Sequence, residues 1–322
     1  MKVIVLMATY EGERYICQQM DSILGQTLKE LKLMVSDDGS KDKTREILKE
    51  YRNQYPDRIV LKHRVQEEDY QNKEQVSGAA MNFFWLLAQA SGDYILFSDQ
   101  DDVWKREKAE KLLKHMKKLE KRLGKDYPIL VHSDMEVTDE DLNMTAPSFF
   151  DYQHCNPKRT SFAEVLVENP VTGGGAMINK ALADLLLKVP EACCMHDWWM
   201  ALTASCFGTI SCIREPLYQY RQHENNVLGA KATGSLEDIK QRARRQAQVE
   251  ENYRKMFAQA AAFGKMYHEQ MSTEQKNILR SFLALPLQSP AGRLHNIVKN
   301  HFFKTSLIQT LAQSVTIPGR ER

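Results

Sequence analysis

An apolar run close to the N-terminus limits the fold more than any other feature. Val3-Ile4-Val5-Leu6-Met7 does not alternate with polar residues, which is typical of a strand buried on both faces of a sheet. Helical spacing follows from Arg14 to Leu24, a second apolar run from Leu31 to Val35, and helical spacing again from Arg45 to Tyr55. The sequence therefore predicts an α/β fold whose central strands are covered by helices.

Three carboxylates follow another apolar run. Tyr94-Ile95-Leu96 predicts a buried strand, and Phe97-Ser98-Asp99-Gln100-Asp101-Asp102 continues from its end. Carboxylates two residues apart at a strand end can lean into one crevice, one binding a divalent cation and the other acting through water or a ribose hydroxyl. Asp139-Glu140-Asp141 has the same spacing, but its polar surroundings predict a solvated turn.

A polar turn, Ser36 to Thr44, follows the second strand. An ionised Asp37 or Asp38 can accept a hydrogen bond from the N3 imide of uracil or thymine, so the turn is a candidate base-binding site. Alternatively, Asp37, Asp38 and Ser40 form an Asx turn and cap the next helix. The residues alone leave both interpretations open.

Two segments in the second half of the chain have candidate site residues. Gly173-Gly174-Gly175 precedes a predicted strand, where the backbone either approaches a ligand closely or makes a bulge with no ligand. His196-Asp197-Trp198-Trp199 opens a helical pattern that runs to Cys206, so a capping role is the simpler interpretation of Asp197.

Basic residues flank the aromatic run Pro216 to Tyr220. His223 is a candidate metal ligand, because a neutral imidazole can complete a site built from Asp101 and two phosphate oxygens; a structural histidine is the alternative. Arg221 and Arg214 are candidates for binding a diphosphate, since a guanidinium donates a bidentate fork to phosphate oxygens. Surface salt bridges are the alternative for both arginines.

Together these segments resemble the family 2 glycosyltransferases. The resemblance covers Val3 to about Gly229 and rests on the order and spacing of five segments. These are Ala8-Thr9-Tyr10-Glu11, Ser36-Asp37-Asp38-Gly39-Ser40, Ser98 to Asp102 with Trp104, Val171-Thr172-Gly173-Gly174, and His196 to Trp199. Tyr220-Arg221-Gln222-His223, with Asn226 three residues on, is similar to the rhamnosyltransferase branch.

The resemblance implies a GT-A fold, with a Rossmann-like mixed sheet, a divalent cation (Mg²⁺ or Mn²⁺) and an inverting mechanism. Asp197 is implied as the general base, although many members have Glu-Asp where this chain has His196-Asp197. With dTDP-β-L-rhamnose as donor, inversion gives an α-rhamnosyl linkage. The implied nucleotide-sugar ligands are Ala8, Thr9, Tyr10, Glu11, Asp37, Asp38, Asp99, Gln100 and Arg221. The residues implied beside the donor sugar or the acceptor are Trp104, Thr172, Gly173, Gly174, His196 and Trp198. The implied ligands of the cation are Asp101, His223 and Asp99.

The length of 322 residues and 43% apolar content suit one α/β domain with a helical extension. We expect a donor half at 1–126, an acceptor half at 127–229 and an extension at 230–322. In the extension, Ser235 to Lys265 predicts a long helix that pairs with a second copy. Ala291 to Gln313 predicts a basic amphipathic helix that lies on a membrane or docks on the protein.

Charge and cysteine use restrict the partners. The net charge of +2 argues against a nucleic-acid binder. Ten basic residues against three Glu between Lys105 and Lys125 indicate a solvated helix face or a contact with anionic lipid head groups. Six cysteines without a regular framework are expected to be reduced. Neither a leader nor a long apolar stretch is evident, so we expect a cytoplasmic protein, peripheral at the inner face of the membrane.

Within the resemblance, the acceptor is a lipid-linked precursor of a surface polysaccharide. Alternatives are a transferase of the same family that uses a UDP-hexose or UDP-N-acetylhexosamine, or a scaffold subunit without turnover. A sugar-nucleotide pyrophosphorylase is disfavoured, because the chain lacks the Gly-rich N-terminal loop followed by Arg and Lys.

Overall fold

The structure is a computed structural model that describes residues 1–63, 75–224 and 239–319. Its strands are β1 (Val3–Thr9), β2 (Leu31–Asp37), β3 (Ile59–Lys62), β4 (Gln75–Val76), β5 (Tyr94–Ser98), β6 (Val103–Trp104), β7 (Ile129–Thr138), β8 (Met144–Ala146), β9 (Ala176–Asn179), β10 (Ala192–Cys193) and β11 (Thr209–Arg221). Its helices are α1 (Ile16–Leu24), α2 (Thr44–Gln54), α4 (Gly78–Gln89), α5 (Lys108–Leu123), α6 (Phe149–Tyr152), α7 (Phe162–Val167), α8 (Lys180–Leu185), α9 (His196–Phe207), α10 (Ile239–Tyr267), α11 (Thr273–Leu283), α12 (Pro290–Lys299) and α13 (Leu307–Thr316), with 3₁₀ turns η1 (Gly173–Gly175) and η2 (Leu285–Leu287). Asn226, with the start of the helix expected from Ser235, lies outside the described residues.

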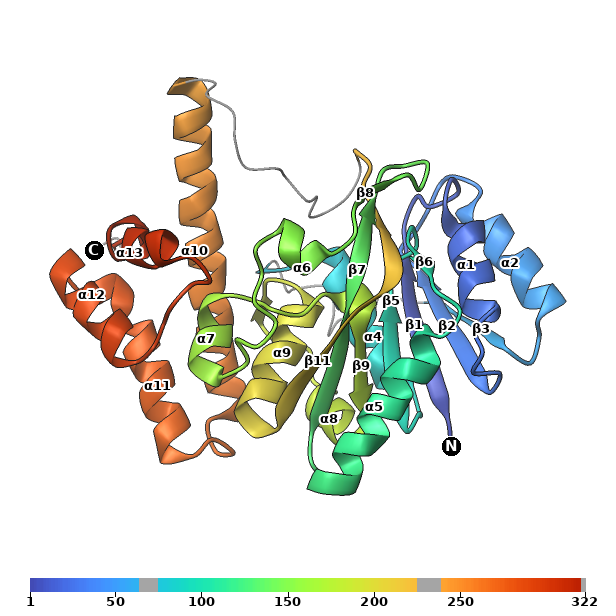
Figure 1. Ribbon diagram of the computed structural model, residues 1–322, viewed down its shortest axis with the longest axis horizontal. Coiled ribbons are helices and arrows are strands. Elements are labelled where there is room, and N and C mark those ends of the chain that lie inside the picture. The colour runs from blue at the N-terminus through green and yellow to red at the C-terminus, as the bar shows by residue number, and fades with distance from the viewer. Residues whose placement is uncertain (64–74, 225–238, 320–322) are drawn as a thin grey trace.

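One mixed sheet forms the centre of the molecule (Figure 1). Among the described residues it has nine strands, in the order β3-β2-β1-β5-β9-β7-β11-β6 with β8 paired to β7. The strands from β3 to β5 are parallel, whereas β9 runs antiparallel to both β5 and β7. The predicted α/β architecture is confirmed, and the carboxyl ends of β1, β2 and β5 meet at one edge of the sheet.

Two hydrophobic cores, one on each face, explain the continuous apolar runs. In β1, Val3, Val5 and Met7 pack into the core shared with α1 and α5, whereas Ile4 and Leu6 pack into the core shared with α4 and α9. A strand with helices on both faces needs apolar residues at every position. The helices expected after β1 and after β2 are found as α1 and α2, and a further helix, α4, precedes β5.

Other sequence-based predictions have mixed outcomes. Asp139 lies in a turn, where its carboxylate accepts hydrogen bonds from the backbone N–H groups of Asp141 and Asn143, as predicted. None of the six cysteines forms a disulfide in the structure. In α6, which follows β8, Phe150 is 1% exposed, so this ring packs in the interior, while Tyr152 is 38% exposed. No described helix has the length and hydropathy needed to cross a membrane.

The C-terminal helices pack on the sheet domain and are not a detached extension. Phe263 of α10 is fully buried against Trp199 of α9 and Phe162 of α7. Figure 1 shows α11, α12 and α13 stacked beside α10, on the side of the molecule away from α1 and α2. The part of α10 around Phe263 therefore faces its own chain.

The single basic helix predicted from Ala291 to Gln313 is wrong. The chain leaves α12 at Asn300, His301 adopts a φ of 59°, and Phe302 is fully buried before α13 begins at Leu307. Burial of the Phe302 ring requires the turn, and no Gly or Pro signals it in the sequence. Arg293, expected on a solvated basic face, is instead only 6% exposed.

Arg293 joins the C-terminal helices. Its guanidinium donates hydrogen bonds to the backbone carbonyls of Leu285, Pro286, Ser314 and Ile317. These are carbonyls at the ends of η2 and α13, where helical hydrogen bonding stops. One side chain therefore fixes α13 against α12.

Replacing this guanidinium should destabilise the C-terminal helices. Arg293→Met leaves buried carbonyls without donors, so we expect a loss of about 3 kcal/mol in the free energy of unfolding, measured by urea denaturation. Arg280→Met, at an exposed position of α11, is the matched control and should change stability by less than about 0.5 kcal/mol. Equal stability of the two variants would contradict this role.

Candidate functional site

The predicted site residues gather at the edge of the sheet where β1, β2 and β5 end. The strands place Thr9, Asp37 and Asp99 there, and Thr9 pairs with Asp37 in the β1–β2 ladder. The turn η1, the first turn of α9 and the end of β11 add residues from the second half of the chain. Segments that are distant in the sequence therefore form one polar site.

Buried carboxylates dominate this site. Asp102 is fully buried, and its Oδ2 has no hydrogen-bond partner among the described residues. Burial, followed by the charge of Asp101, raises the pKa of Asp102 well above its usual value. Burial, and then the charges of Asp101 and Asp197, raises the pKa of Asp99 to about 7. Four carboxylates thus influence one another in a small, poorly solvated volume.

Lys108 is the buried cation of the cluster, although its basic neighbours in the sequence predict a solvated helix face. It is fully buried at the start of α5, where its Nζ donates a hydrogen bond to the Gly174 carbonyl. The ammonium also lies 3.8 Å from the centre of the Trp104 ring and 3.9 Å from that of Tyr218. Burial lowers the pKa of Lys108 well below its usual value, although the charges of Asp102 and Asp99 oppose that shift. The charge of Lys108 in turn lowers the pKa of both Asp99 and Asp102. The sequence contained one indication of this buried lysine. Lys108 follows shortly after Asp102 and lies in the first turn of the helix that comes after the acidic strand end.

The glycines of η1 let the backbone approach the carboxylates. A Cβ at Gly174 would lie 3.0 Å from Asp102 Oδ2 and 3.3 Å from Asp99 Oδ2. A Cβ at Gly173 would lie 2.7 Å from Nε2 of His196. The backbone of η1 therefore approaches other groups closely, as predicted, and in this structure those groups are protein side chains.

Asp197 lies in the first turn of α9, as expected. Its Oδ2 accepts a hydrogen bond from the Gly173 N–H at 3.1 Å, and its Oδ1 accepts one from the Trp198 N–H at 2.6 Å. Burial raises the pKa of Asp197 to about 6, although these hydrogen bonds oppose the shift. A carboxylate with these properties can accept a proton near neutral pH.

His196, the residue before the base candidate, is an interior residue. It is 4% exposed and stacks on Phe83 with 3.9 Å between ring centres. Burial lowers the pKa of His196 to about 3, so the ring is neutral. A neutral ring can stack inside an apolar core, whereas a glutamate cannot. The histidine that this chain has at position 196, where many family members have glutamate, therefore changes both the packing and the charge.

Asp101 and His223 lie together, as the sequence predicted. Nε2 of His223 is 2.9 Å from Oδ2 of Asp101, and the imidazole packs on Tyr15. Adjacent ligands of an octahedral Mg²⁺ or Mn²⁺ lie about 3 Å apart, so this spacing fits a shared cation. In the part of the chain that the structure describes, no three His, Cys, Asp or Glu side chains form a metal site by themselves. Further ligands would have to come from elsewhere, such as phosphate oxygens.

Arg221 supports this arrangement from within the protein. It is 2% exposed, and its guanidinium donates hydrogen bonds to the carbonyls of Asp101 and Glu140 and to Oε1 of Gln18. It therefore holds the Asp101 loop in place, whereas its predicted contact with a diphosphate stays a prediction. Arg214 is exposed and pairs with Asp151, which is the surface salt bridge considered as its alternative.

The first loops of the chain form a connected polar rim. Asp37 accepts hydrogen bonds from the N–H groups of Gly39 and Ser40 and from the Thr9 hydroxyl, so the Asx-turn alternative describes its contacts. The helix-capping part of that alternative is wrong, because α2 has no side-chain cap. Next to this turn, the Asp38 N–H donates to the Thr9 carbonyl.

Contacts of Gln100 and Glu11 complete the polar rim. Gln100 exchanges two hydrogen bonds with the backbone of Tyr10, which is 58% exposed. Glu11 accepts a hydrogen bond from the Lys41 N–H, and Ala8 pairs with Ser36 in the sheet. The loop after β1 is thus fixed to the acidic loop after β5.

The remaining predicted residues support the site from inside. Trp104 is 3% exposed and packs against Lys108, so its contact with a sugar stays a prediction. The Thr172 hydroxyl lies 3.1 Å from that of Tyr218, and Trp198 donates its indole N–H to the Val165 carbonyl.

Removing the buried cation should change the pH at which the acidic cluster works. In Lys108→Met the pKa of Asp99 rises further above about 7, so Asp99 carries a proton at pH 7. We expect Mn²⁺-dependent binding of a nucleoside diphosphate to weaken about tenfold at pH 7 and to recover at pH 8.5, measured by calorimetry. Lys111→Met, on the exposed face of α5, should bind normally at both pH values. A loss that is equal at both would indicate a packing defect instead.

Comparisons with known proteins agree with this geometry. Residues 4–187 match the family described as glycosyl transferase family 2. A dTDP-rhamnosyl transferase of Shigella flexneri, RfbG, is 29% identical over 232 residues, which are 70% of this chain and 74% of that protein. By contrast, the match to an uncharacterized glycosyltransferase of Nostoc is 31% identical over 113 residues, 35% of this chain and 32% of that protein.

Solved structures agree on the fold. TarS of S. aureus in complex with UDP-GlcNAc superimposes with a TM-score of 0.56 at 17% identity, over 98% of this chain and 87% of that chain. A mannosyltransferase of Pyrobaculum calidifontis in complex with GDP-Man and Mn²⁺ gives a TM-score of 0.54 at 17% identity, over 98% and 79%. Because the family match spans more than half of the chain, the protein belongs to glycosyl transferase family 2, and it has the GT-A fold.

Proposed function

We propose that this protein is a metal-dependent inverting glycosyltransferase that moves L-rhamnose from dTDP-β-L-rhamnose onto a hydroxyl of a lipid-linked surface polysaccharide precursor. The observation that carries the proposal is the position of Asp197. Its carboxylate is held by the Gly173 N–H at the same site as Asp99, and its pKa is about 6. A base of this kind is what attack by an acceptor hydroxyl requires.

In this mechanism Asp197 takes the proton of the acceptor hydroxyl while that oxygen attacks the anomeric carbon from the face opposite the diphosphate. The carbon–oxygen bond to the diphosphate breaks, and the sugar configuration inverts. Two backbone N–H groups keep the Asp197 carboxylate in one orientation, so no reorganisation is needed when the hydroxyl arrives. Glycine at 173 is needed for this contact, because a side chain there would displace His196.

Asp101 and His223 are the proposed protein ligands of the cation, with Asp99 beside them. With phosphate oxygens as further ligands, Mg²⁺ or Mn²⁺ held there would supply positive charge to the leaving diphosphate. Other residues of the chain position these two ligands: Arg221 donates a hydrogen bond to the Asp101 carbonyl, and Tyr15 packs against the His223 ring. The Pyrobaculum mannosyltransferase, which has this fold and was solved in complex with Mn²⁺, supports a cation at this site.

The Shigella relative, named as a dTDP-rhamnosyl transferase, supports rhamnose as the donor sugar. The rim around Asp37 and Thr9 would hold the pyrimidine base, with Tyr10 as an exposed aromatic surface beside it. UDP-GlcNAc in a TarS complex favours the second candidate, a transferase that uses a UDP-sugar.

A lipid-linked acceptor is supported by α13. Four large apolar side chains project from this helix: Leu307 is 78% exposed, Ile308 80%, Leu311 58% and Val315 67%. Such a stripe suits the interfacial region of a bilayer. We therefore propose a cytoplasmic protein that is peripheral at the inner face of the membrane.

The base assignment predicts a pH-dependent rate. Because the acting form of Asp197 is ionised, transfer should increase as pH rises through about 6 and should fall below it. Asp197→Asn should lower the rate by at least about a hundredfold and abolish this pH limb, with donor affinity within about threefold. The measurement is a pH profile of sugar transfer together with calorimetric donor binding.

Asp126→Asn, at an exposed position, is the control and should keep both the rate and the pH profile. If Asp197→Asn retained the acidic limb, Asp197 would not be the base. Donor binding by the native protein without any turnover would favour the scaffold function.

A donor panel tests the rest of the proposal. The protein should be stabilised by dTDP-rhamnose in the presence of Mn²⁺ or Mg²⁺ and much less in EDTA. A ligand at about a hundredfold over its dissociation constant adds about 2.7 kcal/mol to the free energy of unfolding. Thermal shifts with dTDP-rhamnose, UDP-GlcNAc and UDP-glucose measure the preference. A larger shift with a UDP-sugar would replace rhamnose by that sugar, and equal shifts in EDTA would contradict the cation.

A further inference from the structure

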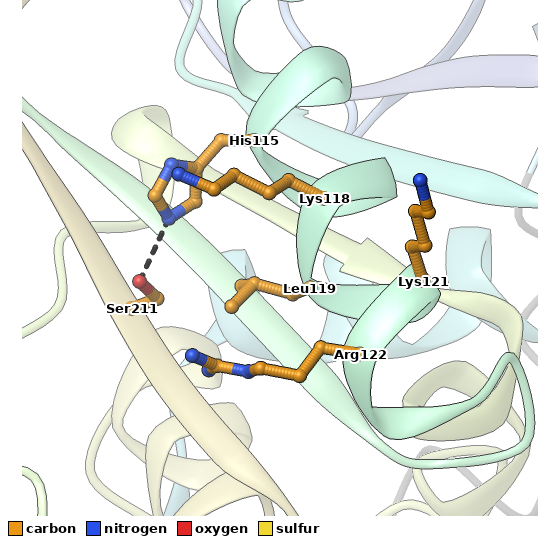
Figure 2. A pocket seen from close by; sticks show the side chains of 6 residues that line it. All are labelled: His115, Lys118, Leu119, Lys121, Arg122 and Ser211. Carbon is orange, nitrogen blue, oxygen red and sulfur yellow. Dashed lines mark hydrogen bonds between the residues drawn. The ribbon is translucent and has the colours of Figure 1, made fainter.

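A cavity lies far from the acidic site, between the C-terminal half of α5 and the start of β11. It has a volume of about 510 Å³ and is lined by His115, Lys118, Leu119, Lys121, Arg122 and Ser211. Figure 2 shows Lys118 and Arg122 extending from α5 toward β11, with His115 and Leu119 beside them; Lys121 points outward at the edge. Cavities of several hundred Å³ are the size at which small molecules bind.

The side chains that line this cavity carry positive charge that no acidic side chain in the lining neutralises. Within the described chain, Lys118, Lys121 and Arg122 form no ion pair, and no acidic side chain lines the cavity. The glutamates of α5 are used elsewhere. Glu120 is buried and accepts a hydrogen bond from the Tyr94 hydroxyl, Glu107 pairs with Lys111, and Glu110 accepts a hydrogen bond from Thr27.

The floor of the cavity is polar and fixed. Nε2 of His115 lies 2.8 Å from Oγ of Ser211, so the ring and the hydroxyl hold each other in place. Partial burial and the charge of Lys118 lower the pKa of His115. The charge of Lys118 thus disfavours a second positive charge on the ring, and an anion bound beside both groups would relieve this repulsion.

The cavity is separate from the catalytic edge. Ser211 pairs with Val131 near the start of β7, whereas Arg221 pairs with Thr138 at its end. Because β11 has register shifts between these positions, the separation follows from the partner strand, where the seven residues from Val131 to Thr138 span about 23 Å. In Figure 1 the cavity end of α5 and the apolar helix α13 lie on different sides of the molecule. Neither the donor site nor the membrane face of α13 accounts for these basic residues.

We propose that the cavity between α5 and β11 is a binding site for a phosphate-bearing anion, held by Lys118 and Arg122 together with the His115–Ser211 pair. The planar guanidinium of Arg122 donates two parallel hydrogen bonds to phosphate oxygens, and Lys118 adds a mobile charge. The volume exceeds that of a single phosphate, so a diphosphate or a phosphate ester is the fitting class. A free phosphorylated metabolite and a lipid head group share this chemistry.

The test uses inorganic diphosphate in EDTA, which suppresses cation-dependent binding at the catalytic site. The pocket variant is Lys118→Glu with Arg122→Glu. The control is Lys114→Glu with Lys117→Glu, which changes net charge equally on exposed positions of α5 outside the cavity. Calorimetry should show diphosphate binding weakened at least about tenfold in the pocket variant and less than about threefold in the control. Sugar transfer should be unchanged in both.

Two further measurements separate the sources and protect against misfolding. Sedimentation with phosphatidylglycerol vesicles tests a head group; loss in the pocket variant alone, without diphosphate binding, would assign the site to lipid phosphate. In the native protein, diphosphate should shift the His115 imidazole resonance, identified by its absence in His115→Gln. Equal weakening in both charge variants would show diffuse attraction and overturn the site. So would an unshifted His115 resonance with no binding of either probe.

Discussion

Buried negative charge is the constraint on which the site depends. The end of β5 brings Asp99, Asp101 and Asp102 together, and α9 adds Asp197. Isolated buried carboxylates would take up protons, because burial without a counter-charge strongly disfavours the ionised form. Lys108 is the buried cation that opposes this tendency. Its own burial is made tolerable by two aromatic rings and the Gly174 carbonyl. The first turn of α5 is therefore part of the site as well as part of the helical layer.

The same lysine connects the two halves of the chain. The carbonyl that it holds belongs to η1, and η1 provides the N–H that orients Asp197. Glycines at 173 and 174 keep this turn within van der Waals reach of Asp99, Asp102 and His196. Because β9 follows directly and pairs antiparallel with β5, the register of that pair sets the distance between the acidic loop and the base. Displacement of the turn would move Asp197 relative to the acidic cluster.

The sequence predicted the sheet side of the molecule well, because buried strands and their covering helices leave periodic patterns. It also placed the acidic loop, the glycine turn, Asp197 and His223, whose positions follow from strand ends. It did not predict Lys108 as a buried cation, since only its place in the first turn after the acidic strand end distinguishes this lysine from the solvated lysines of the same helix. Arg221 and Arg293 were assigned to ligand or surface roles, yet both bind backbone carbonyls inside the protein. Such contacts depend on tertiary packing and have no local pattern. The break between α12 and α13 is of the same kind, because burial of Phe302 determines it.

The charge of the site itself argues for a cation. Three further carboxylates and one buried ammonium lie near Asp197, the proposed base, and the guanidinium of Arg221 already donates to protein oxygens. A nucleoside diphosphate carries negative charge, so its approach to such a cluster is opposed by repulsion that weak solvation strengthens. Extra positive charge is therefore needed before a donor of this class can bind. In our proposal the Asp101–His223 pair holds this charge beside the cluster, while the basic residues that line the cavity between α5 and β11 lie on α5 at the opposite end of the sheet.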